Sequence, residues 1–210
     1  MMIYKSPSAE LPADFSGGFV RVMTKNIPDG NTFNVSYQMG FNTNATFRNF
    51  QLTDGTAKDY LGFGAGVRNL PSSFPAHLGE HSTDEAAAFT RQINQRWGIN
   101  KFTAIPDQKI SLTSHRSYDV GGWKIGNITN LNWSTEFDYS ETVNNNYIAY
   151  DVKNDVSRPR FEYNDIRYKN TSKLGALFNW SFQRDGSKYE LRNFFSQRGV
   201  SALTQREGMN

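Results

Sequence analysis

The sequence predicts an all-β protein, an antiparallel transmembrane β-barrel fragment of about five strands, and three observations support this prediction. Apolar and polar residues alternate over runs longer than the roughly 5–6 residues of a typical globular strand. Tight glycine turns alternate with long connections along the chain. No apolar run approaches the roughly 18 residues that a membrane helix needs, so any span must be made of strands.

The alternation is clearest in three runs, at 33–41, 123–140 and 173–183, and two weaker runs lie at about 108–118 and 187–197. Successive side chains of a strand point to opposite faces, so each run predicts one apolar and one polar face. We expect the apolar set to meet lipid and its neighbours to line an aqueous lumen. In the first two strong runs the apolar set is Phe33, Val35, Tyr37, Met39, Phe41, Trp123, Ile125, Leu131, Trp133, Phe137 and Tyr139.

The runs predict barrel strands near 31–43, 108–120, 123–141, 166–183 and 187–201, after a separate strand near 18–25. A tilted membrane strand needs about 9–11 residues, which these lengths supply. Asp119–Gly122 and Asp185–Gly186 are typical of tight hairpin turns, whereas residues 44–107 and 142–166 predict long loops. Short turns on one rim and long loops on the other are typical of outer-membrane barrels, with the long loops outside the cell.

The first long loop has predicted structure of its own. Ser82 and Glu85 fit a helix-capping box, and apolar residues at helical spacing follow before Gly98. They predict a short helix over about 83–97 that packs the extracellular loop. Residues 58–75 are rich in glycine, proline and aromatic side chains, which favours a folded lid over an unstructured linker.

Composition and motifs exclude several other classes. The chain has no cysteine, and its 23 basic residues are spread out, so neither thiolate chemistry nor nucleic-acid binding is indicated. The three histidines have no spacing partners, and no nucleotide-binding loop, HExxH or nucleophile motif is present. We therefore expect no metal, no cofactor and no enzymatic activity.

Two segments resemble one known family. YKSPSAELPADFSGGFVRVMTKNIPD (4–29) is similar to the end of the plug domain of TonB-dependent outer-membrane receptors. KDYLGFGAGVRNLPSSFP (58–75) resembles the loop after the first barrel strand in the branch of that family with an N-terminal carboxypeptidase-regulatory-like domain.

This resemblance implies a plug end at 1–29 and the N-terminal part of the barrel at 30–210. Gly17 and Gly18 would stand at the junction of plug and barrel, and Lys25 would close the last plug strand. The implied partners are outer-membrane lipid of a Gram-negative bacterium and the TonB complex, reached through an N-terminal part absent from these residues. The implied function is active uptake of a siderophore, glycan, peptide or similar ligand.

We expect these residues to be a piece of a larger barrel, because five antiparallel strands leave two open edges and even the smallest barrels have about eight strands. Lys58, Asp59, Arg68 and Trp97 in the long loop are candidates either for ligand contact or for holding the loop together. Two other readings stay open. One is a passive porin-like or adhesive barrel, and the other is a soluble glycan-binding β-sandwich whose apolar faces would pack against each other.

Overall fold

The computed structural model describes residues 2–4, 19–21, 27–64, 69–93 and 98–209, and it is an all-β structure of antiparallel sheets with one α-helix among these residues. Near the N-terminus, β1 (Met2–Tyr4) pairs with β2 (Phe19–Arg21), which falls inside the strand predicted near 18–25. The predicted junction residues Gly17, Gly18 and Lys25 lie outside the described residues.

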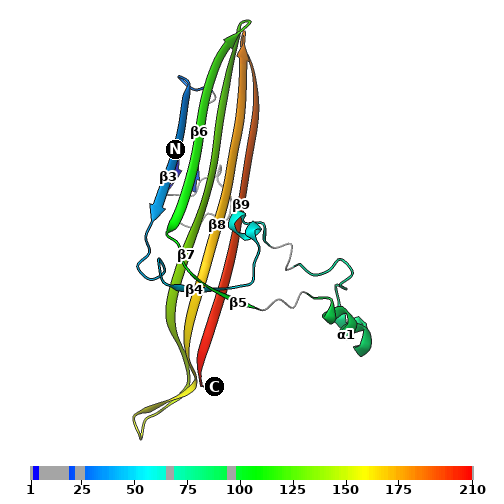
Figure 1. Ribbon diagram of the computed structural model, residues 1–210, viewed down its shortest axis with the longest axis vertical. Helices are drawn as coiled ribbons and strands as arrows, with labels where there is room; N and C mark the ends of the chain where they lie inside the picture. Colours follow the sequence, from blue (N-terminus) through cyan, green and yellow to red (C-terminus); the bar gives the residue numbers. More distant parts are fainter. Residues whose placement is uncertain (1, 5–18, 22–26, 65–68, 94–97, 210) are drawn as a thin grey trace.

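The main sheet has the strand order β3–β6–β7–β8–β9, in which every strand pairs with its neighbour antiparallel. Its strands are β3 (Thr32–Gly40), β6 (Asp107–Val120), β7 (Trp123–Asp151), β8 (Val156–Arg184) and β9 (Ser187–Met209). The five strands predicted from the alternation are therefore confirmed. β3 and β9 form the two open edges of this sheet (Figure 1).

The predicted loop at 142–166 is wrong. β7 and β8 stay paired through this region up to Asp151 and Val156, with a register irregularity between Asn146 and Ala149. The connection is thus a long two-stranded hairpin, which projects at the bottom of the view in Figure 1. Its interstrand backbone hydrogen bonds replace the solvent that a loop would need.

The two tight turns are confirmed, and both lie at the opposite end of the sheet from that hairpin (Figure 1). Gly121 and Gly122 join β6 to β7 with φ of 57° and 79°, and Asp185 and Gly186 join β8 to β9 with φ of 48° and 80°. Two successive positive φ values define the type I′ turn, whose twist matches that of the flanking strands. Glycine and aspartate tolerate this left-handed backbone better than other residues.

The registers place most apolar residues of the five strands on one face, although Ile128, Leu177, Phe194 and Val200 lie on the other. One row, for example, joins Tyr37, Ile110, Trp133, Leu174 and Gln197, and the next joins Val35, Leu112, Leu131, Ala176 and Phe195. We call this side of the sheet the apolar face. Its exposed large side chains are Phe33, Val35, Tyr37, Met39, Ile110, Tyr118, Val120, Leu131, Phe178, Tyr189, Leu191 and Phe195.

A small second sheet covers part of this face. β4 (Asn49–Thr53) pairs with β5 (Ile99–Thr103). Phe50 of β4 contacts Phe102 of β5, and it packs against Phe137 and Tyr168 of the main sheet, while Phe102 also contacts Phe137. Phe50 and Phe137 are 1% and 2% exposed. The expectation that Phe137 and Tyr139 meet lipid is therefore wrong, because they pack in or against this core.

The rest of the long loop carries η1 (Ala57–Leu61), η3 (Leu78–Glu80) and α1 (Thr83–Arg91). Ser82 and Glu85 form the predicted capping box, with the Glu85 carboxylate accepting from the Ser82 N–H at 3.0 Å. The helix is shorter than the predicted 83–97. Phe89 packs its ring against Phe74 and His81, within the loop rather than on the main sheet. No helix among the described residues is long and apolar enough to cross a membrane.

Candidate functional site

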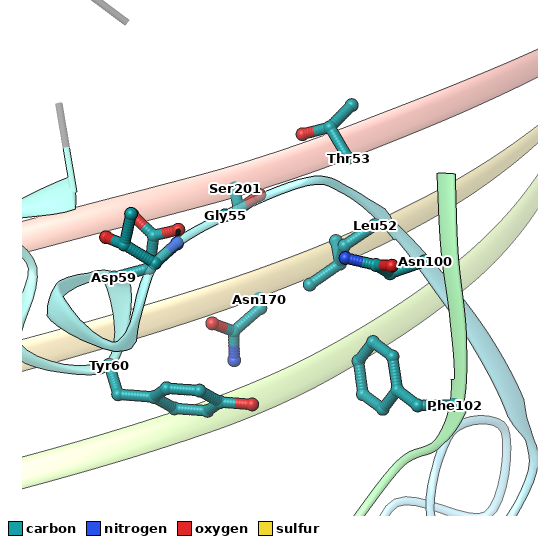
Figure 2. Close-up of a pocket in the computed structure, with 10 residues that line it drawn as sticks. Leu52, Thr53, Gly55, Asp59, Tyr60, Asn100, Phe102, Asn170 and Ser201 are labelled. Atoms are coloured by element: carbon teal, nitrogen blue, oxygen red, sulfur yellow. Dashed lines mark hydrogen bonds between the residues drawn. The ribbon is translucent and has the colours of Figure 1, made fainter. Parts of the chain in front are cut away.

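The candidate site is the part of the apolar face that lies under the loop. We call residues 42–64 and 98–104, which contain β4, η1 and β5, the lid. The lid contacts side chains of the strands on the apolar face, and Figure 2 shows η1 and β5 lying over β7, β8 and β9. Because the lid lies on this face, its described residues contact the apolar side of the sheet and not the charged side.

The apolar face changes composition where the lid lies. Trp133 and Leu174 form one row, and beyond it come the small or polar residues Thr135, Asn170, Ser172, Gly199 and Ser201, which we call the polar notch. Thr135 and Ser172 are buried, and their hydroxyls lie 3.3 Å apart. The Asn170 amide donates to Thr135 Oγ1 at 3.0 Å. Hydrogen bonding within the notch offsets the cost of burying these groups under the lid.

Four hydrogen bonds join described residues of the lid to the main sheet, three donated by side chains of the sheet and one by a side chain of the lid. Trp133 Nε1 donates to the Tyr60 carbonyl at 2.6 Å, and Gln197 Nε2 donates to the Gly62 carbonyl at 2.6 Å. Gln205 Nε2 donates to Gln51 Oε1 at 3.0 Å. In the fourth bond the lid is the donor, from Asn42 Nδ2 to the Phe137 carbonyl at 3.2 Å. The lid is therefore fixed both by apolar packing at Phe50 and by polar contacts spread over β7 and β9.

Two glycines allow the lid to approach the sheet closely. Gly62, with φ of 82°, ends η1 in the left-handed conformation. A Cβ built on Gly199 of β9 would lie 2.6 Å from the Gly62 Cα, and one on Gly62 would lie 3.0 Å from the Gly199 nitrogen. Neither position has room for a side chain, because the two backbones are in direct contact.

A wide, open hollow of about 660 Å³ lies between lid residues 44–49 and Tyr139, Glu141 and Tyr168 of the sheet. Two smaller, adjoining cavities of about 220 Å³ and about 320 Å³ remain between η1 and the sheet. Both are lined by Asp59, Asn170 and Ser201. Tyr60, Asn100 and Phe102 complete the wall of the smaller cavity that Figure 2 shows. Pockets for drug-sized ligands have volumes of roughly 300–1,000 Å³. The smaller of the two adjoining cavities lies below this range, and the larger only reaches its lower bound.

Of the four predicted loop residues, the structure describes Lys58 and Asp59. Asp59 Oδ2 accepts from the Thr56 N–H at 2.9 Å and so caps η1, and a Cβ on Gly64 would overlap the Asp59 carboxylate. These contacts support the alternative in which Asp59 holds the loop together. Lys58 is exposed on η1. Arg68 and Trp97 lie outside the described residues.

The sequence alone did not single out Gln197 and Gln205 of β9, which hold the lid, or Asn170 of β8, which lies in the polar notch beneath it. A signal was present, because these polar residues occupy positions whose parity is otherwise apolar. Such interruptions of an alternating strand mark where a second layer with hydrogen-bonding groups covers it.

The opposite face of the sheet carries opposed charges. Lys173 lies 3.1 Å from Glu136, and Lys169 lies 2.8 Å from Asp138. Arg206 forms a two-pronged pair with Asp165, at 2.7 Å for each oxygen, and this lowers the pKa of Asp165. This face is thus polar and charged, as the alternation predicts, from the level of Glu136 toward the 142–166 hairpin.

Two groups beside the lid have perturbed pKa values. Burial raises the pKa of Asp107, with the nearby Glu136 and Asp138 carboxylates adding to the effect, although the Phe137 N–H donates to Asp107 Oδ1 at 2.8 Å and opposes it. The pKa of Tyr139 is raised to about 12 because its phenol donates to Glu141. Among the described residues, no group of three or more His, Asp or Glu side chains could hold a metal ion.

Comparison with known proteins adds no relative. No protein-family model matches the chain, and no curated protein or solved structure matches it significantly. Function is therefore inferred from the geometry of the sheet and its lid, together with the resemblance of residues 4–29 and 58–75 to the family named above.

Proposed function

We propose that this chain is part of the wall of an outer-membrane β-barrel that belongs to a TonB-dependent receptor for active ligand uptake. The observation that carries the proposal is the apolar face between the tight turns and the row of Trp133 and Leu174, which we call the apolar band. Its large side chains are exposed across all five strands of the sheet. A patch of this extent is a contact surface, and lipid is the partner that fits a face spanning a whole sheet.

The height of the band supports a membrane span. From Trp123 to Trp133, β7 covers about 11 residues, or roughly 36 Å at about 3.3 Å per residue. A strand tilt of about 40° reduces this to roughly 28 Å, close to the ~25 Å apolar belt of outer-membrane barrels. Aromatic residues mark both limits. Trp123 and Tyr189 lie 6.1 Å apart at the turn end, and Trp133 lies at the lid end.

Polar residues interrupt the band at Ser114, Arg116, Asn127, Thr129 and Asn193. Asn193 Nδ2 donates to the Phe178 carbonyl at 3.1 Å. Asn127 Nδ2 donates to the Asn179 carbonyl at 3.1 Å, and Thr129 Oγ1 donates to Asn127 Oδ1 at 3.1 Å, so these two groups are paired within the sheet. Arg116 lies two rows from the tight turn at Val120. Its long aliphatic stem allows the guanidinium to reach the headgroup layer.

The two open edges favour a barrel that further strands complete. The N–H and C=O groups on the outer sides of β3 and β9 would each cost several kcal/mol in hydrocarbon if left unpaired. Closure of the sheet by additional strands removes this cost. The energy-coupled, plugged receptor is the more specific part of the proposal, and it depends on the resemblance of residues 4–29 and 58–75 alone.

The two alternatives make different demands. A soluble sandwich needs a second layer over the whole apolar face, whereas the lid covers the part beyond Trp133, at Phe137 and Tyr168, and reaches only one row further at Phe63. A passive or adhesive barrel shares the sheet and differs in lacking a plug. The coding sequence upstream of this chain separates these cases, because a plug domain and a TonB-contacting segment are required only by the active receptor.

The membrane part of the proposal is tested with the complete protein encoded by the gene, reconstituted in phosphatidylcholine vesicles. Because residues 1–210 contain no cysteine, single cysteines can carry an environment-sensitive fluorophore once any cysteine elsewhere is replaced by serine. A probe at Leu131→Cys should be quenched by nitroxides on the lipid chains. A probe at Lys173→Cys, on the opposite face, should be quenched by aqueous iodide instead. The reverse result would overturn the proposal.

A further inference from the structure

We propose that the η1 edge of the lid, formed by Tyr60, Leu61 and Phe63, lies in the headgroup layer of the membrane as an interfacial contact. This inference rests on the proposed function, since it takes the apolar band as the lipid-facing surface. It assigns a lipid partner to a loop segment that the sequence alone offered as a contact for a transported ligand. Its basis is where this edge sits on the sheet, which side chains it exposes, and what charge accompanies them.

The first step is position. The Tyr60 carbonyl is bonded to Trp133, and the Gly62 carbonyl is bonded to Gln197 in the same row of the sheet. Phe63 stacks on Phe195, one row nearer the tight turns, with ring centroids 6.2 Å apart and planes 17° from parallel. The η1 edge therefore lies at the limit of the apolar band, on the same face, where the band meets the lid.

The second step is exposure. Tyr60, Leu61 and Phe63 are 45%, 47% and 43% exposed although the lid folds them against a sheet. Burying such side chains in an apolar environment is worth roughly 1.5–3 kcal/mol each, so three exposed together in four residues favour a contact. A membrane interface accommodates apolar side chains next to a tyrosine hydroxyl and backbone carbonyls.

The third step is charge. Lys58 is exposed on η1, two residues before Tyr60. A lysine near the surface of an anionic bilayer contributes roughly 1 kcal/mol of attraction to phosphate-bearing headgroups. Its aliphatic stem can follow the apolar edge while the ammonium stays with the phosphates. The edge thus combines apolar anchors with a cation, as interfacial segments do.

The opposite face is the one that stays available to a transported ligand. The lid and the cavities beneath it lie on the lipid-facing side of the sheet, whereas the ion pairs of Glu136, Asp138 and Asp165 lie on the other. Lys58 and the η1 edge then help to set the depth and orientation of the receptor in the membrane. They do not select what it carries.

The test uses labelled single-cysteine variants of the complete, reconstituted protein. Probes at Leu61→Cys and Phe63→Cys should be quenched by nitroxides at the headgroup or high on the acyl chain. A probe at Leu131→Cys should be quenched by deep nitroxides. Phe47→Cys is the matched control, because Phe47 is a lid residue that is 68% exposed but packs with Phe41 away from the η1 edge. It should respond to neither lipid quencher.

The outcomes separate the inference from the proposed function. Quenching at position 131 without quenching at 61 and 63 overturns the inference and leaves the membrane proposal standing. Absence of lipid quenching at all three positions overturns both. Equal shallow quenching at positions 47 and 61 overturns the assignment to the η1 edge. A second readout is Lys58→Gln, which should remove the increase in quenching at position 63 produced by adding phosphatidylglycerol to the vesicles, whereas Lys153→Gln at the far hairpin should leave it unchanged.

Discussion

The indole of Trp133 donates a hydrogen bond of 2.6 Å to the backbone carbonyl of Tyr60. Trp133 thereby has two roles at one level of the sheet. Its ring ends the apolar band, and its only donor group satisfies a carbonyl of the lid. Tryptophan suits such a position because most of its surface is apolar while the N–H needs a partner.

The Trp133 bond predicts a defined weakening of the lid. Trp133→Phe keeps an aromatic ring on the apolar face but removes the donor, and a typical hydrogen bond of this kind contributes about 0.5–1.5 kcal/mol. We expect roughly two- to tenfold faster protease cleavage within residues 55–64 of the reconstituted protein. Trp180 lies on the same face, but its ring partners are Phe178 and Phe182 of β8 and not lid residues, so Trp180→Phe should leave the cleavage rate unchanged. Equal rates for wild type and Trp133→Phe would show that the bond does not hold the lid.

Phe50 predicts a larger effect. It is fully buried between the two sheets, in edge-to-face contact with Phe137 at 5.4 Å and Tyr168 at 5.2 Å. Replacing a buried phenylalanine by alanine costs about 3–5 kcal/mol through lost apolar contact and the cavity left behind. Hydrogen exchange of the β4 and β5 amides should report this loss. Phe47→Ala, at an exposed lid position, should change exchange little. Unchanged protection in Phe50→Ala would contradict the two-layer packing.

The turn between β8 and β9 tests the hairpin geometry alone. Gly186 has φ of 80° and open space where a Cβ would stand, so only backbone strain opposes a side chain. Gly186→Ala should cost about 1–2 kcal/mol in the free energy of unfolding. Gly30→Ala, which also meets no neighbour but does not have a positive φ, is the control. Urea unfolding from micelles measures both, and an equal effect of the two substitutions would argue against the type I′ turn.

Asp107 predicts a pH dependence. Its pKa is raised above the ordinary 3.8 by burial, so its contribution to stability is present below that value and is lost as the pH rises through the raised pKa. Asp107→Asn keeps an oxygen that can accept from the Phe137 N–H and removes the charge. We expect the variant to be at least as stable as wild type at pH 7, with a flatter stability profile between pH 4 and 7. Melting curves over that range, with Asp119→Asn as the charge control, would reveal the opposite trend if it exists.

The sequence predicts the main sheet well because its determinants are local. Alternation sets the strands, and a turn such as Gly121–Gly122 needs only its own residues. The hairpin at 142–166 was missed because Asn144, Asn145 and Asn146 interrupt the alternation. Both faces there carry exposed apolar residues, among them Val143 and Ile148. Backbone pairing with the neighbouring strand overrides this weak local signal.

The placement of the lid could not be predicted in the same way. Phe50 and Phe137 are distant in the sequence, and nothing in either run indicates that they touch. The Gly62–Gly199 contact depends on how η1 lies on β9, which tertiary packing determines. The glutamines of β9 signal that a layer covers them, but they do not identify which segment of the chain forms it.

The unequal lengths of the two edge strands have a consequence for the proposed receptor. β3 ends at Gly40, opposite Asp107 and near the level of Glu136, whereas β9 continues to Met209, at the level of Glu162 and Asn145. The difference is about nine residues, or roughly 30 Å along the strands. The rim of this part of the barrel would therefore be uneven, rising along β7, β8 and β9 well above the end of β3.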